Sequence, residues 1–306
     1  MELKKFKRIN NIVAVAVLFI ASFTYLSTIE PTVSFWDCGE FIASSYKLEV
    51  GHPPGNPVFQ LIARFFTLFG GPEDAAMLVN VMSAMCSAFT IFFLYLTIVH
   101  LGRRIVEKTK GEMTLASATG VFGAGIVGAL AYTFSDTFWF SAVEAEVYAM
   151  SSLFTAVVFW AMLRWEEEAD MPYANRWIVL IAFLMGISIG VHLLNLLTIP
   201  ALVFIYYYKK YEVTGKRTVM VLLLSGVILG AILYGIIPYL PKIAAYVDLA
   251  YSVRKSAYDA CWKLRQSKIV KAEYDGRATW VIHVACFHHS CFDKAFGDAS
   301  SRQDVM

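Results

Sequence analysis

The stretch Trp177–Tyr208, WIVLIAFLMGISIGVHLLNLLTIPALVFIYYY, decides the fold class. It contains no Asp, Glu, Lys or Arg, and as a single helix it would measure roughly 48 Å, against a bilayer core of about 30 Å. Arg176 precedes the stretch and Lys209 and Lys210 follow it, so both ends favour the same side of a membrane. We therefore predict two short helices that fold back near His192–Asn195.

Five further apolar runs have the length of a membrane span, about 20 residues each. The chain of 306 residues is 58% hydrophobic and only 16% charged, whereas a soluble domain carries about 25% charged residues. The net charge is +2 without a basic stripe between aromatic residues, so we expect no nucleic-acid partner. The sequence predicts an all-α, polytopic membrane protein with about seven spans. The five runs are Ile9–Ile29, Met77–Leu101, Leu115–Phe134, Val143–Leu163 and Thr218–Tyr239.

Lysine and arginine are distributed unevenly between the loops. If the N-terminus is inside, the outer segments up to the last span hold only Lys47 and Arg64, and nearly all other basic residues fall inside. The positive-inside rule therefore predicts a cytoplasmic N-terminus and a long non-cytoplasmic loop, Glu30–Ala76. No A-x-A site follows the first run, which favours an uncleaved signal anchor. We expect this multi-pass protein in the bacterial inner (plasma) membrane rather than the endoplasmic reticulum.

The first outer loop carries the strongest candidate residues. Asp37 and Glu40 are three residues apart and would share a face on a helical turn. Partial desolvation beside a membrane raises carboxyl pKa values and makes a competent base; the alternative is a pair of solvated loop acids. His52 opens a proline-rich turn that either holds it near Asp37 or starts the next element. Arg64 lies in Val58–Phe69, which fits an interfacial helix or packing under the loop.

Four more polar residues fall at the same predicted face. Glu144 and Glu146 lie where an apolar helix begins, which suits either the helix dipole or a site at the edge of the bilayer. His192 and Asn195 occupy the apex of the predicted hairpin, as a polar pocket or phosphate contact, or as core residues. We therefore regard all four as candidates for substrate binding.

Two patterns are better explained by packing or chance. Gly123, Gly125 and Gly128 match a dinucleotide-binding pattern, but they lie inside a span, where glycines allow close helix packing. The His and Cys residues between His283 and Cys291 have the residue types of a metal site without a zinc spacing. We expect neither a metal nor a cofactor.

Four segments together resemble glycosyltransferase family 117, membrane enzymes of GT-C type that are similar to the transmembrane protein O-mannosyltransferases. The resemblance covers about residues 9–245. It implies a GT-C-like helical bundle, a polyprenyl- or dolichyl-phosphate sugar donor, and an acceptor hydroxyl on a protein or glycan outside the cytoplasm. It also implies an inverting reaction in which the carboxylate residue Asp37 is the catalyst and Glu40 lies beside it. The segments are Phe35–Phe41 (FWDCGEF), Gly51–Gly55 (GHPPG), Val143–Tyr148 (VEAEVY) and Gly190–Asn195 (GVHLLN).

The resemblance stops near Ala245, so we divide the chain into a transmembrane domain, 1–245, and a polar tail, 246–306. The tail is either divergent or read out of frame past a truncation, and the chain is then the enzyme or an N-terminal piece of one. Two other classes stay open: a small-solute transporter and a non-catalytic membrane scaffold. Transporters usually keep ionisable residues near the bilayer midplane, and these spans are almost free of them.

Overall fold

The computed structural model describes residues 2–52 and 55–272. Every regular element in these residues is helical, which confirms the all-α prediction. The chain divides into two compact units, residues 1–229 and residues 230–306. The first unit contains every candidate site residue. The expected domain boundary at residues 245 and 246 stays a prediction.

The helices follow the apolar runs closely. Helix α1 takes the first run, α4 the second, α5 the third and α7 the fourth, and short helices lie between them. The elements are α1 (Leu3–Ser27), α2 (Cys38–Lys47), α3 (Pro57–Thr67), the 3₁₀ turn η1 (Pro72–Asp74), α4 (Ala75–Lys110), α5 (Leu115–Thr133), α6 (Asp136–Ala142), α7 (Val147–Glu168), α8 (Asn175–Ile189), the 3₁₀ segment η2 (Leu193–Thr198), α9 (Ile199–Lys210), α10 (Gly215–Gly230), the π-helical segment η3 (Ala231–Ile236) and α11 (Ile237–Ala272).

Among the described residues, five helices are long and apolar enough to cross a membrane. They begin at Leu3, Pro72, Leu115, Val147 and Gly215. The long run Trp177–Tyr208 is divided, as predicted, into the shorter α8 and α9, which are separated by a turn and η2 around His192–Asn195. The protein is therefore a polytopic helical membrane protein.

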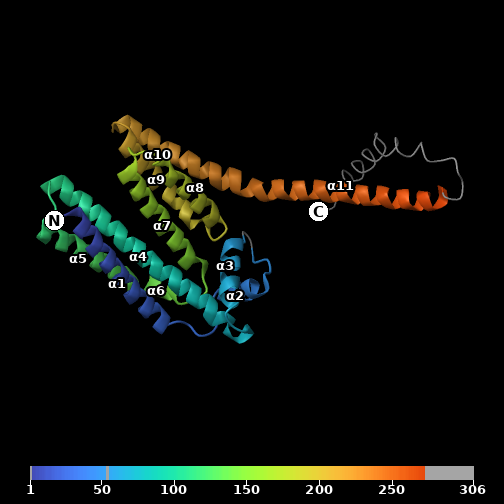
Figure 1. Ribbon diagram of the computed structural model, residues 1–306, viewed down its shortest axis with the longest axis horizontal. Helices are drawn as coiled ribbons and strands as arrows, with labels where there is room; N and C mark the ends of the chain where they lie inside the picture. The colour runs from blue at the N-terminus through green and yellow to red at the C-terminus, as the bar shows by residue number, and fades with distance from the viewer. Residues whose placement is uncertain (1, 53–54, 273–306) are drawn as a thin grey trace. The chain divides into compact units, whose positions relative to one another are not determined.

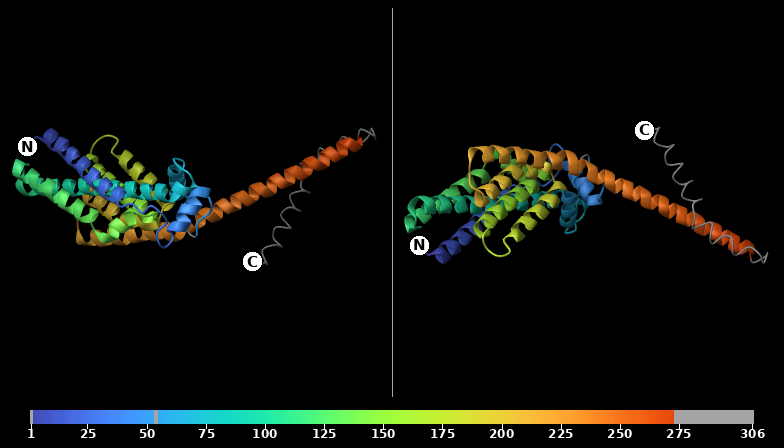
Figure 2. Two further views of the ribbon diagram at one scale, coloured as in Figure 1. Left: turned by 90° about the horizontal axis from the view of Figure 1, so that it is seen from below. Right: turned by 90° about the horizontal axis from the view of Figure 1, so that it is seen from above.

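Helix α4 is the central element of the first unit. It packs against α1 and α5 on one side and against α7 on the other, and Figures 1 and 2 show these long helices side by side. One apolar core joins α1, α4, α5 and α6 around Tyr25, Ile91 and Tyr95. A second joins α7, α8 and α9 around Trp165 and Leu202. The N-terminus lies at the opposite end of α4 from α2 and α3 (Figure 1).

Local sequence signals set where several helices begin. Thr114 caps α5, because its hydroxyl accepts from the backbone N–H of Ser117 while the Ser117 hydroxyl accepts from the N–H of Thr114. Proline occupies the first turn of α3 and of α9, where no backbone donor is needed. Helix α7 starts at Val147, four residues later than the predicted run, because Val143 ends α6 as its C-cap, where its carbonyl accepts from the N–H of Glu30.

Two of the three glycines singled out in α5 allow close helix packing, as expected. A side-chain carbon at Gly125 would lie 2.6 Å from Val99 Cγ2 and 2.8 Å from Tyr95 Cε2, and one at Gly128 would lie 2.7 Å from Ile98 Cδ1. At Gly123 the same carbon would meet nothing within 4 Å. Two of the three glycines therefore bring α5 close to α4.

The second unit is described only in part. Helix α11 continues from Ile237 to Ala272, and its described side chains are mostly exposed. The expected tail thus includes helix as far as Ala272. The His and Cys residues from His283 to Cys291 lie outside the described residues.

The glycine packing predicts a contrast between two matched substitutions. Gly125→Ala should lower the free energy of unfolding by about 1–3 kcal/mol, because the new methyl group overpacks the contact with Val99 and Tyr95. Gly123→Ala should leave it unchanged or raise it by up to about 1 kcal/mol, since alanine favours a helix. Thermal unfolding in detergent would measure both. Equal midpoints for the two variants would contradict the packing role.

Candidate functional site

The first outer loop enters α2 through a strained backbone. Trp36 has φ 60°, a left-handed conformation that is unusual for a bulky residue, and its side chain is 88% exposed. Asp37 follows at the N-cap, but its side chain makes no capping hydrogen bond. The Asp37 carboxylate is exposed, whereas Cys38, the next residue, is fully buried. The turn therefore presents Asp37 outward and sends Cys38 into the protein.

Glu40 holds His52, so the two residues form a pair. The backbone N–H of His52 donates to Glu40 Oε1 at 2.6 Å, and His52 Nδ1 lies 3.1 Å from Glu40 Oε2. These contacts, the backbone hydrogen bond first, lower the pKa of Glu40. Phe41 stacks near the imidazole at 5.8 Å. The structure thus places His52 against Glu40, whereas the sequence had suggested that the turn could hold His52 near Asp37.

Two carboxyl groups from the segment between α6 and α7 are buried beside the start of α2. Glu144 is 4% exposed and Glu146 is 7% exposed. The Cys38 thiol donates to Glu146 Oε1 at 3.7 Å, and Glu144 Oε2 has no hydrogen-bond partner among the described residues. We call Asp37, Cys38, Glu144 and Glu146 the acidic cluster.

Burial tunes the titration of the acidic cluster. It raises the pKa of Glu146 to about 7, and the nearby charges of Glu144 and Asp37 act in the same direction. Burial also raises the pKa of the Cys38 thiol. Cys38 is therefore a protonated hydrogen-bond donor near neutral pH, and Glu146 exchanges a proton there. The sequence signalled neither the role of Cys38 nor its contact with Glu146.

The apex of the α8–α9 hairpin joins the same region. The backbone N–H of Val58 in α3 donates to the Gly190 carbonyl at 2.8 Å, and a side-chain carbon at Gly190 would lie 2.6 Å from Val58 Cγ2. Only glycine permits this approach without displacing Val58. His192 follows two residues later, with its ring 5.3 Å from that of Tyr148.

His192 and Asn195 have different surroundings. Burial lowers the pKa of His192, and its Nδ1 accepts from the backbone N–H of Leu194 at 3.1 Å. The neutral ring then carries its proton on Nε2 as a donor. Asn195 is fully buried, and its amide donates to the Ser188 hydroxyl at 2.9 Å. Asn195 thus has an internal structural contact, whereas His192 keeps a donor for a ligand.

Arg64 packs between α2 and α3. Its guanidinium carbon lies 4.9 Å from the centre of the Tyr46 ring, and Nη1 donates to the Thr67 hydroxyl at 3.2 Å. Within residues 2–52 and 55–272, no hydrogen bond or ion pair joins Arg64 to the acidic cluster. No group of three or more His, Cys, Asp or Glu side chains in the same residues could hold a metal ion.

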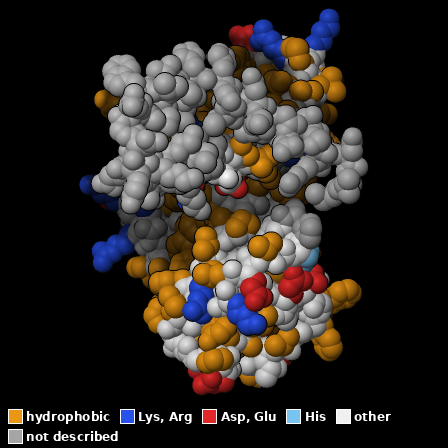
Figure 3. All heavy atoms as spheres, turned by 90° about the vertical axis from the view of Figure 1, so that its right-hand side faces the viewer, with side chains coloured by type: hydrophobic (Ala, Val, Ile, Leu, Met, Phe, Trp, Pro, Cys, Tyr) orange, Lys and Arg blue, Asp and Glu red, His pale blue; other side chains and the backbone are white. Residues whose placement is uncertain are grey.

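A single apolar core lies beneath these residues. It contains buried side chains from α2, α3, the start of α4, the segment between α6 and α7, the start of α7 and the hairpin apex, including Cys38, Phe59, Ala145, Met150 and Val191. Figure 3 looks onto this end of the molecule, where acidic and basic side chains gather among hydrophobic ones below the grey atoms. Three of the four sequence segments contribute residues to this core, and the fourth is held against α2 by the Glu40–His52 contact.

A groove of about 760 Å³ borders the hairpin apex. Its walls come from α4, α5 and α7, and η2 closes it with Leu194, Leu197 and Thr198. The other lining residues are mainly apolar or small hydroxyl residues, such as Thr90, Ile98, Thr155 and Phe159. Leu194 follows His192 by two residues, so the groove reaches the segment of the chain that carries the imidazole.

The raised pKa of Glu146 predicts a pH dependence of stability. Between pH 4.5 and about 7 the folded protein keeps a proton that the unfolded chain has lost, so the free energy of unfolding falls as the pH rises through this window. Glu146→Gln should remove this part of the fall, whereas Glu112→Gln, at an exposed loop position, should retain it. Unfolding midpoints at about pH 5 and about pH 8 would measure the difference. Parallel profiles for wild type and Glu146→Gln would contradict the assignment.

Comparisons with known proteins find a matching family and related proteins. Residues 37–215, which contain α2 to α9, match the family described as protein O-mannosyl-transferase TMEM260 N-terminal domain. The protein O-mannosyl-transferase tmem260 of Dictyostelium discoideum is 25% identical over 239 residues, 76% of this chain and 27% of that protein. The protein O-mannosyl-transferase TMEM260 of Mus musculus is 25% identical over 176 residues, 58% of this chain and 23% of that protein. No solved structure matches the chain.

These matches assign the family and cover only part of each relative. The chain spans about a quarter of the length of these curated relatives. Both relatives are eukaryotic, so they do not support the expected bacterial membrane. The resemblance to membrane O-mannosyltransferases is confirmed, because the family match covers more than half of the chain. The chain belongs to the family of the N-terminal domain of protein O-mannosyl-transferase TMEM260.

Proposed function

We propose that this chain forms the sugar-transfer region of a membrane protein O-mannosyltransferase. It moves a mannose-like sugar from a polyprenyl- or dolichyl-phosphate donor to a Ser or Thr hydroxyl of an acceptor protein, with inversion at the sugar carbon. The family and the names of both relatives support the reaction class. The observation that carries the proposal is the meeting of the acidic cluster, the Glu40–His52 pair and His192 over one apolar core.

Asp37 acts as the general base on the acceptor hydroxyl. Its carboxylate is exposed and makes no capping hydrogen bond, so an acceptor can reach it. As the acceptor oxygen attacks the sugar, its proton passes to Asp37 and the bond from the sugar carbon to the phosphate oxygen breaks. Burial raises the pKa of Glu146 to about 7, so Glu146 is mostly protonated just below neutral pH and places little negative charge beside Asp37.

Glu40 positions other groups and does not take the proton. Its two carboxylate oxygens already contact the backbone and the ring of His52. The pair fixes the turn that follows α2, so the imidazole of His52 faces the acceptor or the sugar from a defined place. Both side chains stay accessible to a ligand, with 45% of the His52 side chain and 41% of the Glu40 side chain exposed.

His192 and the groove receive the donor. The lipid chain lies along α4, α5 and α7, and its phosphate meets the Nε2–H of His192, which stabilises the charge of the leaving group. A volume of about 760 Å³ admits several isoprenoid units. Lys47, Arg64 and His52 supply further positive charge or donors near this end of the bundle.

The transfer takes place on the non-cytoplasmic face. The basic residues Arg103, Arg164 and Lys209 lie at the end of the helices opposite α2 and α3, and the positive-inside rule assigns that end to the cytoplasm. The acidic cluster then faces the other side, where a translocated acceptor protein is available.

The base assignment predicts a large loss of turnover in Asp37→Asn. General-base assistance is worth about 10²–10⁴-fold, and the amide retains the size of the carboxylate, so the rate should fall on that scale while donor binding persists. Glu40→Gln should cost less, since it perturbs only the His52 contact. Turnover would be measured in membranes that contain the protein, with a lipid-phosphate mannose donor and an acceptor peptide.

Asp136→Asn is the matched control for this experiment. Asp136 is also an exposed acid, in the first turn of α6, and it has no contact with the acidic cluster among the described residues. It should retain wild-type turnover. If Asp37→Asn is fully active, Asp37 is not the general base. If Glu146→Gln is inactive in the same experiment, the general base is Glu146.

The groove predicts a chain-length effect on the donor. Ala156→Phe fills part of the groove, so the KM for a long-chain donor should rise by about tenfold, or roughly 1.4 kcal/mol of lost apolar contact. The KM for a short, water-soluble donor should change little. Val127→Phe, on an exposed face of α5, is the control. Equal KM changes for both donors would show that the lipid chain lies outside the groove.

A further inference from the structure

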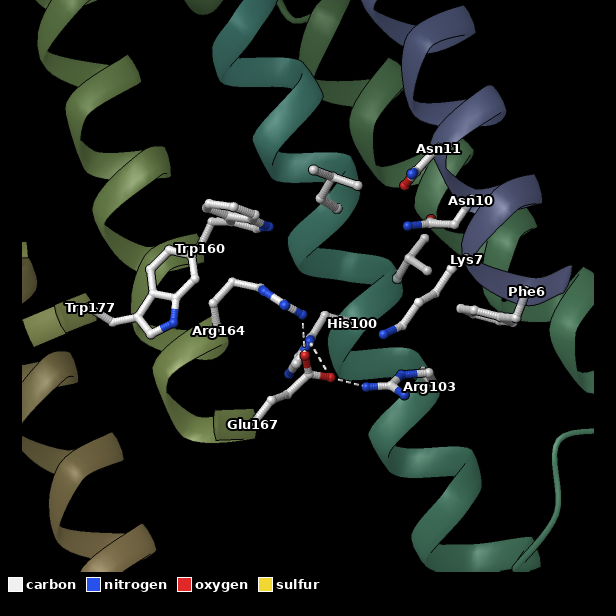
Figure 4. A pocket seen from close by; sticks show the side chains of 12 residues that line it. Phe6, Lys7, Asn10, Asn11, His100, Arg103, Trp160, Arg164, Glu167 and Trp177 are labelled. Carbon is white, nitrogen blue, oxygen red and sulfur yellow. Dashed lines mark hydrogen bonds and ion pairs between the residues drawn. The ribbon is translucent and has the colours of Figure 1, made fainter. Parts of the chain in front are cut away.

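A second cavity lies at the basic end of the first unit, far along α4 from the acidic cluster. It measures about 380 Å³ and is bounded by α1, α4, α7 and the start of α8. Both α1 and α7 pack on α4, so α4 forms the floor and the other helices form the walls. Figure 4 shows polar side chains from three helices directed into this space.

Positive charge dominates the polar lining. Lys7, Arg103 and Arg164 face a single carboxylate, that of Glu167. Glu167 is shared, because Arg103, Arg164 and His100, at 3.6 Å, all contact it. The two arginines have further partners in Glu107 and Glu168, so their charges are largely neutralised.

Lys7 is different. It makes no ion pair within residues 2–52 and 55–272, and it lies on the α1 wall across from Arg164. The amides of Asn10 and Asn11 lie on the same wall, and Asn10 Oδ1 is buried without a hydrogen-bond partner among the described residues. One unpaired cation and spare amide groups therefore remain for a ligand. An anionic ligand beside Lys7 would pair with its ammonium group and accept from the amide N–H groups, whereas the Asn10 oxygen, itself an acceptor, would take a hydroxyl group of the same ligand.

The apolar lining indicates where such an anion comes from. Trp160 and Trp177 pack edge to face with ring centres 5.9 Å apart, and Phe6, Leu96 and Val99 complete the apolar surface. Tryptophan is enriched at the level of lipid head groups. Basic pockets between membrane helices on the cytoplasmic side bind anionic lipid head groups.

We propose that the pocket between α1, α4 and α7 binds a phosphate-bearing anion, supplied by the head group of an anionic phospholipid. The phosphate lies beside Lys7, within reach of the Asn10 and Asn11 amides, and the acyl chains follow the apolar wall beside Trp160. The lipid links α1 to α7 across α4, which raises the stability of the bundle at this end. The site is separate from the proposed sugar-transfer site and does not depend on that activity.

Lipid retention and thermal unfolding of the chain in detergent test the proposal. Native mass spectrometry should show that more phosphatidylglycerol than phosphatidylcholine stays bound to the protein, because the choline group cancels the phosphate charge. Lys7→Gln should weaken this retention by about tenfold, because it removes one charge-assisted contact. In a second measurement, glycerol 3-phosphate is added to the protein as a water-soluble phosphate without acyl chains. If that compound raises the unfolding midpoint, the pocket binds phosphate from a free soluble anion, and the lipid head group is not the required source.

Two variants serve as controls. Lys4→Gln removes an exposed lysine from the same helix outside the pocket, and it should retain the lipid as the wild type does. Lys7→Arg keeps the charge and should restore retention. Because Lys7 is exposed and makes no ion pair among the described residues, Lys7→Gln should fold normally, and its midpoint without lipid checks this. Equal retention of both lipids, or unchanged retention in Lys7→Gln, would overturn the proposal.

Discussion

Burying two carboxyl groups side by side is the constraint on which the outer end of the bundle depends. Glu144 and Glu146 are both nearly excluded from solvent, and an ionised carboxylate in such surroundings is costly unless it is paired. The structure lowers this cost by raising the pKa of Glu146 and by directing the Cys38 thiol at it. The start of α2 must therefore lie against the start of α7, and the first outer loop is held to the bundle there.

The membrane architecture was accessible from the sequence because span length and charge asymmetry are strong, local signals. The apolar runs correspond to α1, α4, α5 and α7, and the break near His192 was predicted because one helix would exceed the bilayer. Helix boundaries were less accessible. Nothing in the run from Val143 reveals that Val143 ends α6, with its carbonyl bound to the N–H of Glu30, and that α7 begins only at Val147. That contact joins residues far apart in the chain.

The site was predicted as a region and not as a set of contacts. Assigning loops to one side of a membrane brings Asp37, Glu144 and His192 to one face, but it does not pair side chains within that face. The Glu40–His52 contact depends on the turn between them, and the burial of Asn195 depends on Ser188 one turn before the hairpin apex. Cys38 was missed because a cysteine beside an acid has no distinctive spacing. Only the packing of α2 reveals it as a donor.

Helix α2 is bracketed by two residues in left-handed conformations, Trp36 before it and Leu48 at its C-cap. Neither is glycine, and such conformations cost of the order of 1–3 kcal/mol each. Phe41 and Ile42 hold α2 in place against this cost, because both are buried in the apolar core beneath the candidate site. The positions of Asp37 and Glu40 are therefore set by a core that neither side chain enters, and a substitution that empties this core would displace both carboxylates.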